Sequence, residues 1–216
     1  MGELVAGRTC GACTACCVVP AIDDPTIQKP AAIRCCHSVP AQGGGASSCA
    51  IYDTRPDVCR RFHCAWRRLG QLDDAWRPDK SHVFIIMDQD KADRGAPGNS
   101  NGNGSTPPAL TLVLIGNPLM TVREHRVVDF VRTRALHALP TFLALPGQPG
   151  LCPLRVMLPA QALHQAARHS AGAVKALLEQ ALKALKAEQP ATHVLTHSGN
   201  DVGTAREPAV HRTASH

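Results

Sequence analysis

The chain has 216 residues, enough for one medium-sized domain or for a small module with a larger companion. Its formal net charge of +6 is spread evenly, because segments 1–80, 81–160 and 161–216 each carry two more basic than acidic side chains. A nucleic-acid-binding surface needs clustered positive charge, so this distribution argues against nucleic acid as a partner.

The first residues contain no apolar stretch of signal-peptide length, and no window approaches the ~18–20 apolar residues of a membrane span. We therefore expect a cytoplasmic protein without a membrane partner. Thiols stay reduced in the cytoplasm, so a segment dense in cysteine indicates metal binding or redox chemistry there rather than a disulfide scaffold.

Four cysteines open the chain in the pattern C-x2-C-x2-C-C, namely Cys10, Cys13, Cys16 and Cys17. Two intervening residues let the chain turn so that both sulfurs of a pair face one point. The spacing begins like the bacterial ferredoxin run, but the fourth cysteine follows at once rather than three residues later. Neighbouring side chains of an extended segment point to opposite sides, so Cys16 and Cys17 suit two adjacent metals, or a larger cluster, better than one ion.

More distant residues are needed to complete such sites. The candidate thiols are Cys35 or Cys36, with Cys49, Cys59 and Cys64. With one of the adjacent pair, eight thiolates are present, enough for two sites of four ligands each. His37 and His63 are further possible ligands, and a Gly- and Ser-rich loop over 42–48 separates the two groups of cysteines.

A helix is predicted from Pro56 to about Gly70, because proline fits the first helical turn and glycine the far end. On a regular helix Cys59 and His63 share a face, whereas Cys59 and Cys64 lie about 140° apart. Either His63 is a ligand or the backbone near Cys64 is not regular helix. Basic side chains beside these cysteines can offset the charge of several thiolates; they are Arg34, Arg55, Arg60 and Arg61.

The region 81–189 has the pattern of an α+β unit. Short β-branched apolar runs predict strands over 83–87 and 112–115, with further strands over 141–145 and 154–158. A loop is expected over 94–108, and the lone Cys152 is expected to be a buried small side chain.

Two longer helices complete this region. Thr121 and Glu124 form a capping-box pattern that predicts a helix running to His137. A stripe at helical spacing predicts a second helix between Pro159 and Pro190, formed by Leu163, Ala167, Ser170, Val174, Leu178, Ala181 and Leu185.

The predicted organisation is therefore a cysteine-cluster metal-binding module over 1–80, an α+β region over 81–189 and a disordered tail over 190–216. The fold class is α+β. A small, irregular, metal-stabilised module is expected to pack on a sheet that carries two longer helices. A Pro-rich segment of about 80 residues has a small core of its own, so bound metal would supply much of its stability.

The full cysteine pattern, with the residues around its second half, resembles that of a known protein family. The opening run together with Cys-x-Ile-Tyr-x-x-Arg-Pro-x-x-Cys-Arg-x-Phe-x-Cys-x-Trp, from Cys49 to Trp66, resembles the CxxCxxCC family of zinc- or iron-chelating proteins, the YkgJ-type cysteine cluster proteins. Residues 77–81 resemble the stretch that follows in one branch, so the likeness covers about 80 residues. The chain departs from the family at Cys35-Cys36-His37, where a single cysteine is usual.

The resemblance implies a bound metal, either zinc or an iron–sulfur cluster, with a structural, redox or metal-handling role. A related cysteine domain occurs in the flagellin lysine N-methylases, so a protein lysine methyltransferase is one alternative function. The sequence offers no recognisable S-adenosylmethionine site for it. A zinc-ribbon-like interaction module is the other alternative, against which the even charge and the scarce aromatic residues count.

Overall fold

A computed structural model describes residues 3–40, 48–87, 108–147 and 154–188 of the chain. The predicted loops over 42–48 and 94–108, Cys152 and the predicted tail lie wholly or largely outside these residues. Among the described helices, none is both long and apolar enough to cross a membrane.

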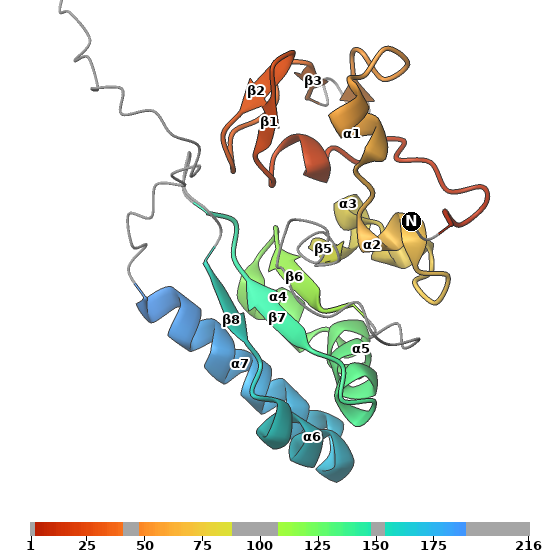
Figure 1. Ribbon diagram of the computed structural model, residues 1–216. Coiled ribbons are helices and arrows are strands. Elements are labelled where there is room, and N and C mark those ends of the chain that lie inside the picture. Colours follow the sequence, from red (N-terminus) through yellow and green to blue (C-terminus); the bar gives the residue numbers. More distant parts are fainter. Residues whose placement is uncertain (1–2, 41–47, 88–107, 148–153, 189–216) are drawn as a thin grey trace, which may run out of the picture.

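A four-stranded sheet is the centre of the fold (Figure 1), and the expected α+β class is confirmed. Its strands, in spatial order, are β5 (Val83–Met87), β6 (Leu110–Leu114), β7 (Thr141–Ala144) and β8 (Arg155–Met157). All four lie where the apolar runs predict them, within one or two residues. β6 and β7 are parallel, because two helices connect them, and the other neighbours are antiparallel.

Helices cover one face of this sheet. They are α4 (Pro118–Arg123), α5 (His125–Leu136), α6 (Ala160–His169) and α7 (Ala171–Ala187). Alternate strand residues such as Val83, Leu112 and Leu143 point toward them and are fully buried with the apolar side of α7. The main hydrophobic core lies in this layer.

Each of the two predicted long helices is broken into two. Asn117 caps α4 by accepting hydrogen bonds from the amides of Leu119 and Met120, so the helix starts before the capping-box pattern at Thr121. The chain is then extended at Glu124 before α5 begins.

The second break falls at Ser170. This residue has extended backbone, and its hydroxyl accepts a hydrogen bond from the amide of Ala173 at the start of α7. Ser170 fits the helical spacing but is a cap rather than part of the apolar stripe. At Ser170 a side-chain oxygen, and at Glu124 a backbone carbonyl, accepts the free amides of the next helix and interrupts a pattern that the apolar spacing alone continues.

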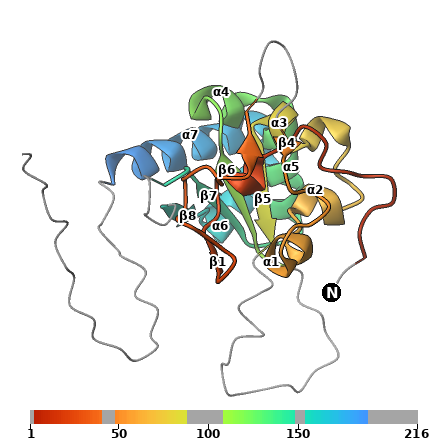
Figure 2. The same cartoon turned by 90° about the horizontal axis from the view of Figure 1, so that it is seen from above.

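The cysteine-rich segment lies against the opposite face of the sheet (Figure 1), and the view from above looks through it onto β5, β6 and β7 (Figure 2). Phe84, Val113 and Ala144 point to this side and pack with Val19 in a second, smaller core. Cys16, Phe62 and Cys64 pack against the same cluster.

Regular structure in this segment is short, as its prolines predict. It comprises η1 (Ala15–Cys17), β1 (Ile22–Asp24), β2 (Ile27–Lys29), β3 (Ser38–Val39), β4 (Ser48–Cys49), α1 (Asp57–Arg61), α2 (Ala65–Arg68), η2 (Asp74–Trp76) and α3 (Pro78–Ser81). The strands form two separate hairpins, β1 with β2 and β3 with β4. The segment therefore has little sheet or helix of its own to hold it together.

The main core also includes residues from the predicted cysteine-cluster module, on the N-terminal side of residue 81. Trp66, Leu72 and Trp76 are buried in it together with residues of the sheet and of α5, and the ring of Trp76 lies 4.9 Å from that of Phe130. Residues 65–81 thus tie the cysteine-rich segment to the larger part of the molecule.

Candidate metal centre

The helix predicted over residues 56–70 is interrupted between Cys59 and Cys64. α1 ends at Arg61, Phe62 and Cys64 have extended backbone, and α2 begins at Ala65. Of the two possibilities left by the spacing, the irregular backbone is the one observed. At this break Cys64 packs against both hydrophobic cores of the sheet.

Four thiols face one another between the opening run and this break. Cys10, Cys13, Cys16 and Cys64 line a single cavity of about 20 Å³, and we call them the inner set. Aromatic rings close the cavity toward the sheet, and the remaining lining residues are Phe62, His63, Trp66, Arg67, Pro78 and Phe84.

Local backbone geometry brings the first two thiols of the inner set together. The amide of Cys13 donates to the carbonyl of Cys10 at 2.9 Å, which closes a tight turn. Gly11 in this turn has a φ of +51°, a conformation that residues with a side chain rarely adopt. The Cys-x-x-Cys spacing therefore produces the turn that it predicts.

Arg8 holds the opening run against α2. Its guanidinium donates to the carbonyls of Trp66 and Leu72 and, at 3.0 Å, to that of Leu69, and it lies over the Trp66 ring. These carbonyls lie in or after the last turn of α2 and accept no hydrogen bond from within that helix. Arg8 donates hydrogen bonds to them instead. Cys10, two residues later, is thereby placed beside Cys64.

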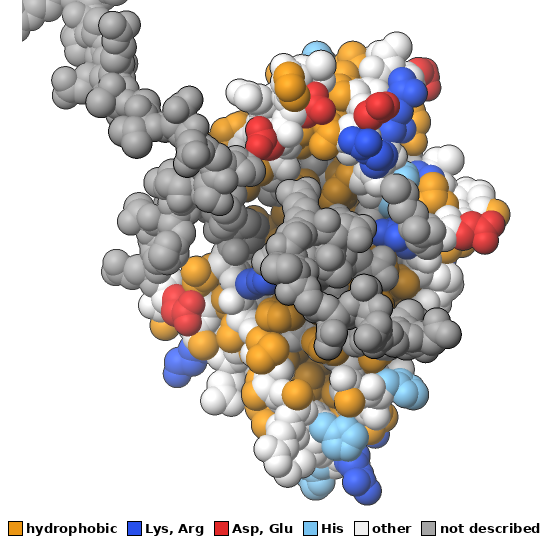
Figure 3. Space-filling model, in the orientation of Figure 1, with side chains coloured by type: hydrophobic (Ala, Val, Ile, Leu, Met, Phe, Trp, Pro, Cys, Tyr) orange, Lys and Arg blue, Asp and Glu red, His pale blue; other side chains and the backbone are white. Residues whose placement is uncertain are grey.

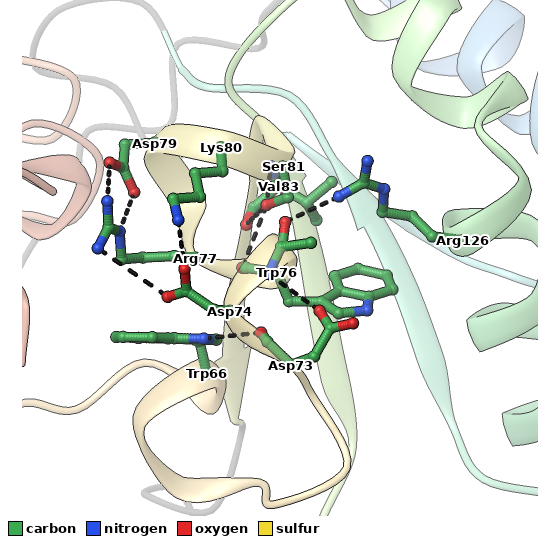
Figure 4. A network of polar contacts seen from close by, with 11 residues as sticks. Trp66, Asp73, Asp74, Trp76, Arg77, Asp79, Lys80, Ser81, Val83 and Arg126 are labelled. Carbon is green, nitrogen blue, oxygen red and sulfur yellow. Dashed lines mark hydrogen bonds and ion pairs between the residues drawn. The ribbon is translucent and has the colours of Figure 1, made fainter. Parts of the chain in front are cut away.

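A polar network fixes α3 at the other side of the cavity (Figure 4). Arg77 donates to both carboxylate oxygens of Asp79, at 2.7 and 2.9 Å, and Lys80 pairs with Asp74. The indole nitrogen of Trp66 donates to the carbonyl of Asp73 at 2.9 Å. The network orients the backbone amide of Asp79 toward the sulfur of Cys13.

Three thiols of the inner set, those of Cys13, Cys16 and Cys64, resist ionisation in the absence of a cation. Burial raises the pKa of Cys13 to about 11, against the opposing effect of the Ala15 and Asp79 amides. Burial also raises the pKa of Cys64, although the amides of Arg67 and Trp66 lie close to its sulfur without forming a regular cap. A hydrogen bond to Cys17, followed by burial, raises the pKa of Cys16.

A second group of thiols, which we call the outer set, consists of Cys17, Cys35, Cys49 and Cys59. The amide of Cys35 donates to the carbonyl of Cys17 at 2.7 Å, and the β3–β4 hairpin places Cys49 opposite Ser38. Burial raises the pKa of Cys59, and the next contributions are the charges of Cys35, Cys17 and Cys49. The four sulfurs therefore lie within electrostatic range of one another.

Cys16 and Cys17 join the two sets. They lie in the short 3₁₀ helix η1 rather than in an extended segment, and their sulfurs share a hydrogen bond. The two side chains nonetheless have different neighbours, as expected. Cys16 interacts with Cys10 and Cys13, whereas Cys17 interacts electrostatically with Cys35 and Cys59.

Basic side chains flank the outer set. The hydrogen bond from Cys16, followed by the charges of Lys29, Arg34 and Arg55 against the effect of burial, lowers the pKa of Cys17 to about 7. Lys29 is buried, and its ammonium donates to the carbonyls of Val18, Pro30 and Ile33 at 2.8–3.0 Å. Arg34 and Arg55 belong to the expected basic group, whereas Lys29 gives no sequence signal because a lone lysine between prolines is ordinary.

Arg67 is the basic side chain beside the inner set, and nothing in the sequence pattern marks it. Its Nη1 donates to the sulfur of Cys10 at 3.6 Å, and its buried Nε has no hydrogen-bond partner. An unpaired buried guanidinium nitrogen is costly unless an anionic acceptor lies next to it. Ionised thiolates around the cavity would supply that acceptor.

The structure separates the two adjacent cysteines left as alternatives. Cys35 is buried and faces Cys17 and Cys59, whereas Cys36 is exposed. His63 lines the inner cavity, where burial and the nearby Arg67, Arg68 and Arg55 lower its pKa. His37 contributes its backbone amide to the sulfur of Cys35.

Within the described ranges, no three Cys, His, Asp or Glu side chains form a group that could hold a metal ion. The nine cysteines of these ranges are all free thiols. The sulfurs are thus gathered in two sets but do not stand at ligating distances. The chemistry of the donors nevertheless fits a thiophilic metal, because each set offers four sulfurs, with His63 also lining the inner cavity, and each has a buried or half-buried cation beside it.

On the face seen in Figure 3, acidic and basic side chains are interspersed over the cysteine-rich segment. No protein-family model, no curated protein and no solved structure matches the chain.

Proposed function

We propose that the chain is a cytoplasmic metal-binding protein that holds two zinc ions, one in the inner set and one in the outer set. The observation that carries the proposal is the gathering of eight thiols, from segments up to 54 residues apart, into two sets of four on one face of the sheet. Four thiolates are a common donor set of structural zinc sites.

The size of the inner cavity favours zinc over an iron–sulfur cluster. A cavity of about 20 Å³ is roughly the space of one water molecule and accommodates a single ion. A cubane cluster adds several iron and sulfide atoms to the thiolates and needs more room. The aromatic residues Phe62, Trp66 and Phe84 restrict expansion of the cavity toward the sheet.

The metal has a structural role in this proposal. Among the residues that the structure describes between positions 3 and 64, few hydrophobic ones are buried, namely Val19, Ile27, Ala31 and Cys35. Structural zinc contributes on the order of 10–16 kcal/mol in small domains, more than such a core can supply. Zinc would fix the segment on the sheet, and the cations Arg67 and Lys29 would offset the excess negative charge of the thiolates.

Metal analysis after anaerobic purification tests this proposal directly. We expect a colourless protein with two zinc ions per chain. A brown protein with iron and sulfide would replace zinc by an iron–sulfur cluster, and a protein with neither metal would remove the proposal.

Substitution of Arg67 by methionine is expected to lower the zinc affinity of the inner set about 10–100-fold, the usual effect of removing a side chain that supports metal ligands. The reason is the loss of the donor to Cys10 and of the unpaired Nε beside the cavity. Competition with a chromogenic chelator measures the change. Methionine at the exposed Arg168, on α6, is the control, and equal effects of the two substitutions would contradict the assigned role of Arg67.

A further inference from the structure

The even charge of the chain conceals one cluster of arginines. Residues 55–68 carry five arginines against one acidic residue, Asp57, which gives this stretch a formal charge of +4. The rest of segment 1–80 carries five basic and seven acidic side chains, a charge of −2. Averaging over the whole segment therefore leaves only +2 and hides the cluster.

The fold gathers four of these arginines around α1 and α2. We call them the arginine cluster; they are Arg55, Arg60, Arg67 and Arg68. Arg60 donates from Nε to the carbonyl of Arg55 at 2.6 Å. Burial lowers the pKa of His63, and the charges of the three members other than Arg60 lower it further, so these guanidinium groups lie near one imidazole. Figure 3 shows Lys and Arg side chains gathered over α1, with acidic ones among them.

Within the described residues, carboxylates form their ion pairs elsewhere in the molecule. All of these pairs lie from Asp74 onward in the chain. Arg55 donates instead to the backbone carbonyl of Tyr52 at 2.7 Å. Arg60 likewise donates to that of Asp53 at 3.2 Å. A neutral carbonyl orients a guanidinium group without cancelling its charge, so the cluster can attract an anion from outside the chain.

Tyr52 places an exposed aromatic ring beside the cluster. The residue is 37% exposed, and the guanidinium carbon of Arg55 lies 3.7 Å from the ring centroid. The amide of Tyr52 donates to the carbonyl of Cys49 at 3.2 Å, so the backbone that carries the ring is held in place. Unpaired nucleobases stack on exposed rings of this kind while neighbouring cations hold their phosphates.

From this combination we infer that the arginine cluster and Tyr52 form a binding surface for single-stranded nucleic acid. Guanidinium groups bind the phosphates, and a base stacks on the Tyr52 ring. An acidic peptide would match the charge but offers no base for the ring. Duplex DNA is not the expected ligand, because α1 and α2 have five and four residues and are too short to read a major groove. The inference goes beyond the proposed function and requires no bound metal.

Fluorescence anisotropy with the full-length protein and a labelled oligothymidylate of about 15 nucleotides tests the inference. We expect binding at low salt that weakens as the salt concentration rises. The log–log slope should be about −2, because single strands contribute about −0.7 for each neutralised phosphate and the cluster meets about three. Arg60→Gln should weaken binding about fivefold or more and make the slope shallower by about 0.7.

Tyr52→Leu separates stacking from charge. It should weaken binding about tenfold or more, the usual effect of losing one base–aromatic contact, and leave the salt slope unchanged. Arg168→Gln, at an exposed position on α6, is the control and should change neither quantity. Thermal unfolding at the wild-type temperature shows that each variant is folded.

Absence of binding at low salt would overturn the inference, as would an Arg60 or Tyr52 variant that binds like the wild type. Equal affinity for polyglutamate of the same length would overturn it in favour of an acidic protein partner. Wild-type protein that binds oligothymidylate but contains no zinc would remove the proposed function and leave the inference standing. Protein that holds zinc without binding oligothymidylate would do the reverse.

Discussion

Replacement of Cys13 by serine is expected to remove the inner zinc ion and to unfold much of the cysteine-rich segment from the sheet. Cys13 lies between the two turns of the opening run and beside the amides of α3, so its loss leaves three thiols around the cavity. Because structural zinc contributes on the order of 10–16 kcal/mol, loss of the ion exceeds what the few buried residues of this segment can offset.

The measurement combines zinc content with amide hydrogen exchange. We expect one zinc ion per chain instead of two and fast exchange in residues 10–35, while β5 to β7 stay protected because most of their core lies on the face of the sheet that the helices cover. Serine at Cys152 is the control and should change neither quantity. Two retained zinc ions in the Cys13 variant would show that the inner set is assigned wrongly.

The zinc affinity of the inner set is expected to fall by at least about a thousandfold for each pH unit below neutrality. The pKa values of Cys13, Cys16 and Cys64 are raised, so at neutral pH the metal-free protein carries a proton on each of these sulfurs. Zinc binding must therefore expel at least these three protons. Because protons and zinc compete for the same sulfurs, lower pH favours the metal-free state.

The outer set should depend on pH less steeply, because the pKa of Cys17 is lowered to about 7 and its proton is partly lost beforehand. Calorimetric titration with zinc in buffers of different ionisation enthalpy counts the protons released. Serine at Cys59 leaves the inner set for separate measurement. Release of fewer than three protons at the inner set would contradict the assigned thiols.

Without metal, the sign of the pH dependence reverses. The pKa of the Cys13 thiol is 9.0 as an ordinary value and about 11 in the folded chain, so the folded state holds this proton more tightly. The stability that this gives is fully present below about pH 9 and is lost as the pH rises through 11. Metal-free protein should therefore unfold more readily in alkali, which urea titrations at several pH values would detect.

The strands and the cysteine turns could be predicted because their causes are local. Runs such as Val83–Met87 are β-branched and apolar, and they form strands wherever a sheet can bury them. Conversely, both long helices were predicted as continuous, because apolar spacing does not reveal that Ser170 caps a new helix or that Glu124 is extended. The competing interaction there is a side chain or backbone group that satisfies free amides.

The sequence by itself determined that thiols must meet, since nine cysteines within 55 residues of a Pro-rich segment leave few other arrangements. It also predicts that one member of the adjacent pair Cys35 and Cys36 belongs to the cluster, without deciding which. Only the tertiary structure decided which thiols share a set, that Cys35 is the buried member, and that Arg67 and Lys29 lie beside the sulfurs. The physical reason is that burial and charge proximity arise from packing on the sheet, which joins residues whose spacing in the chain carries no such information.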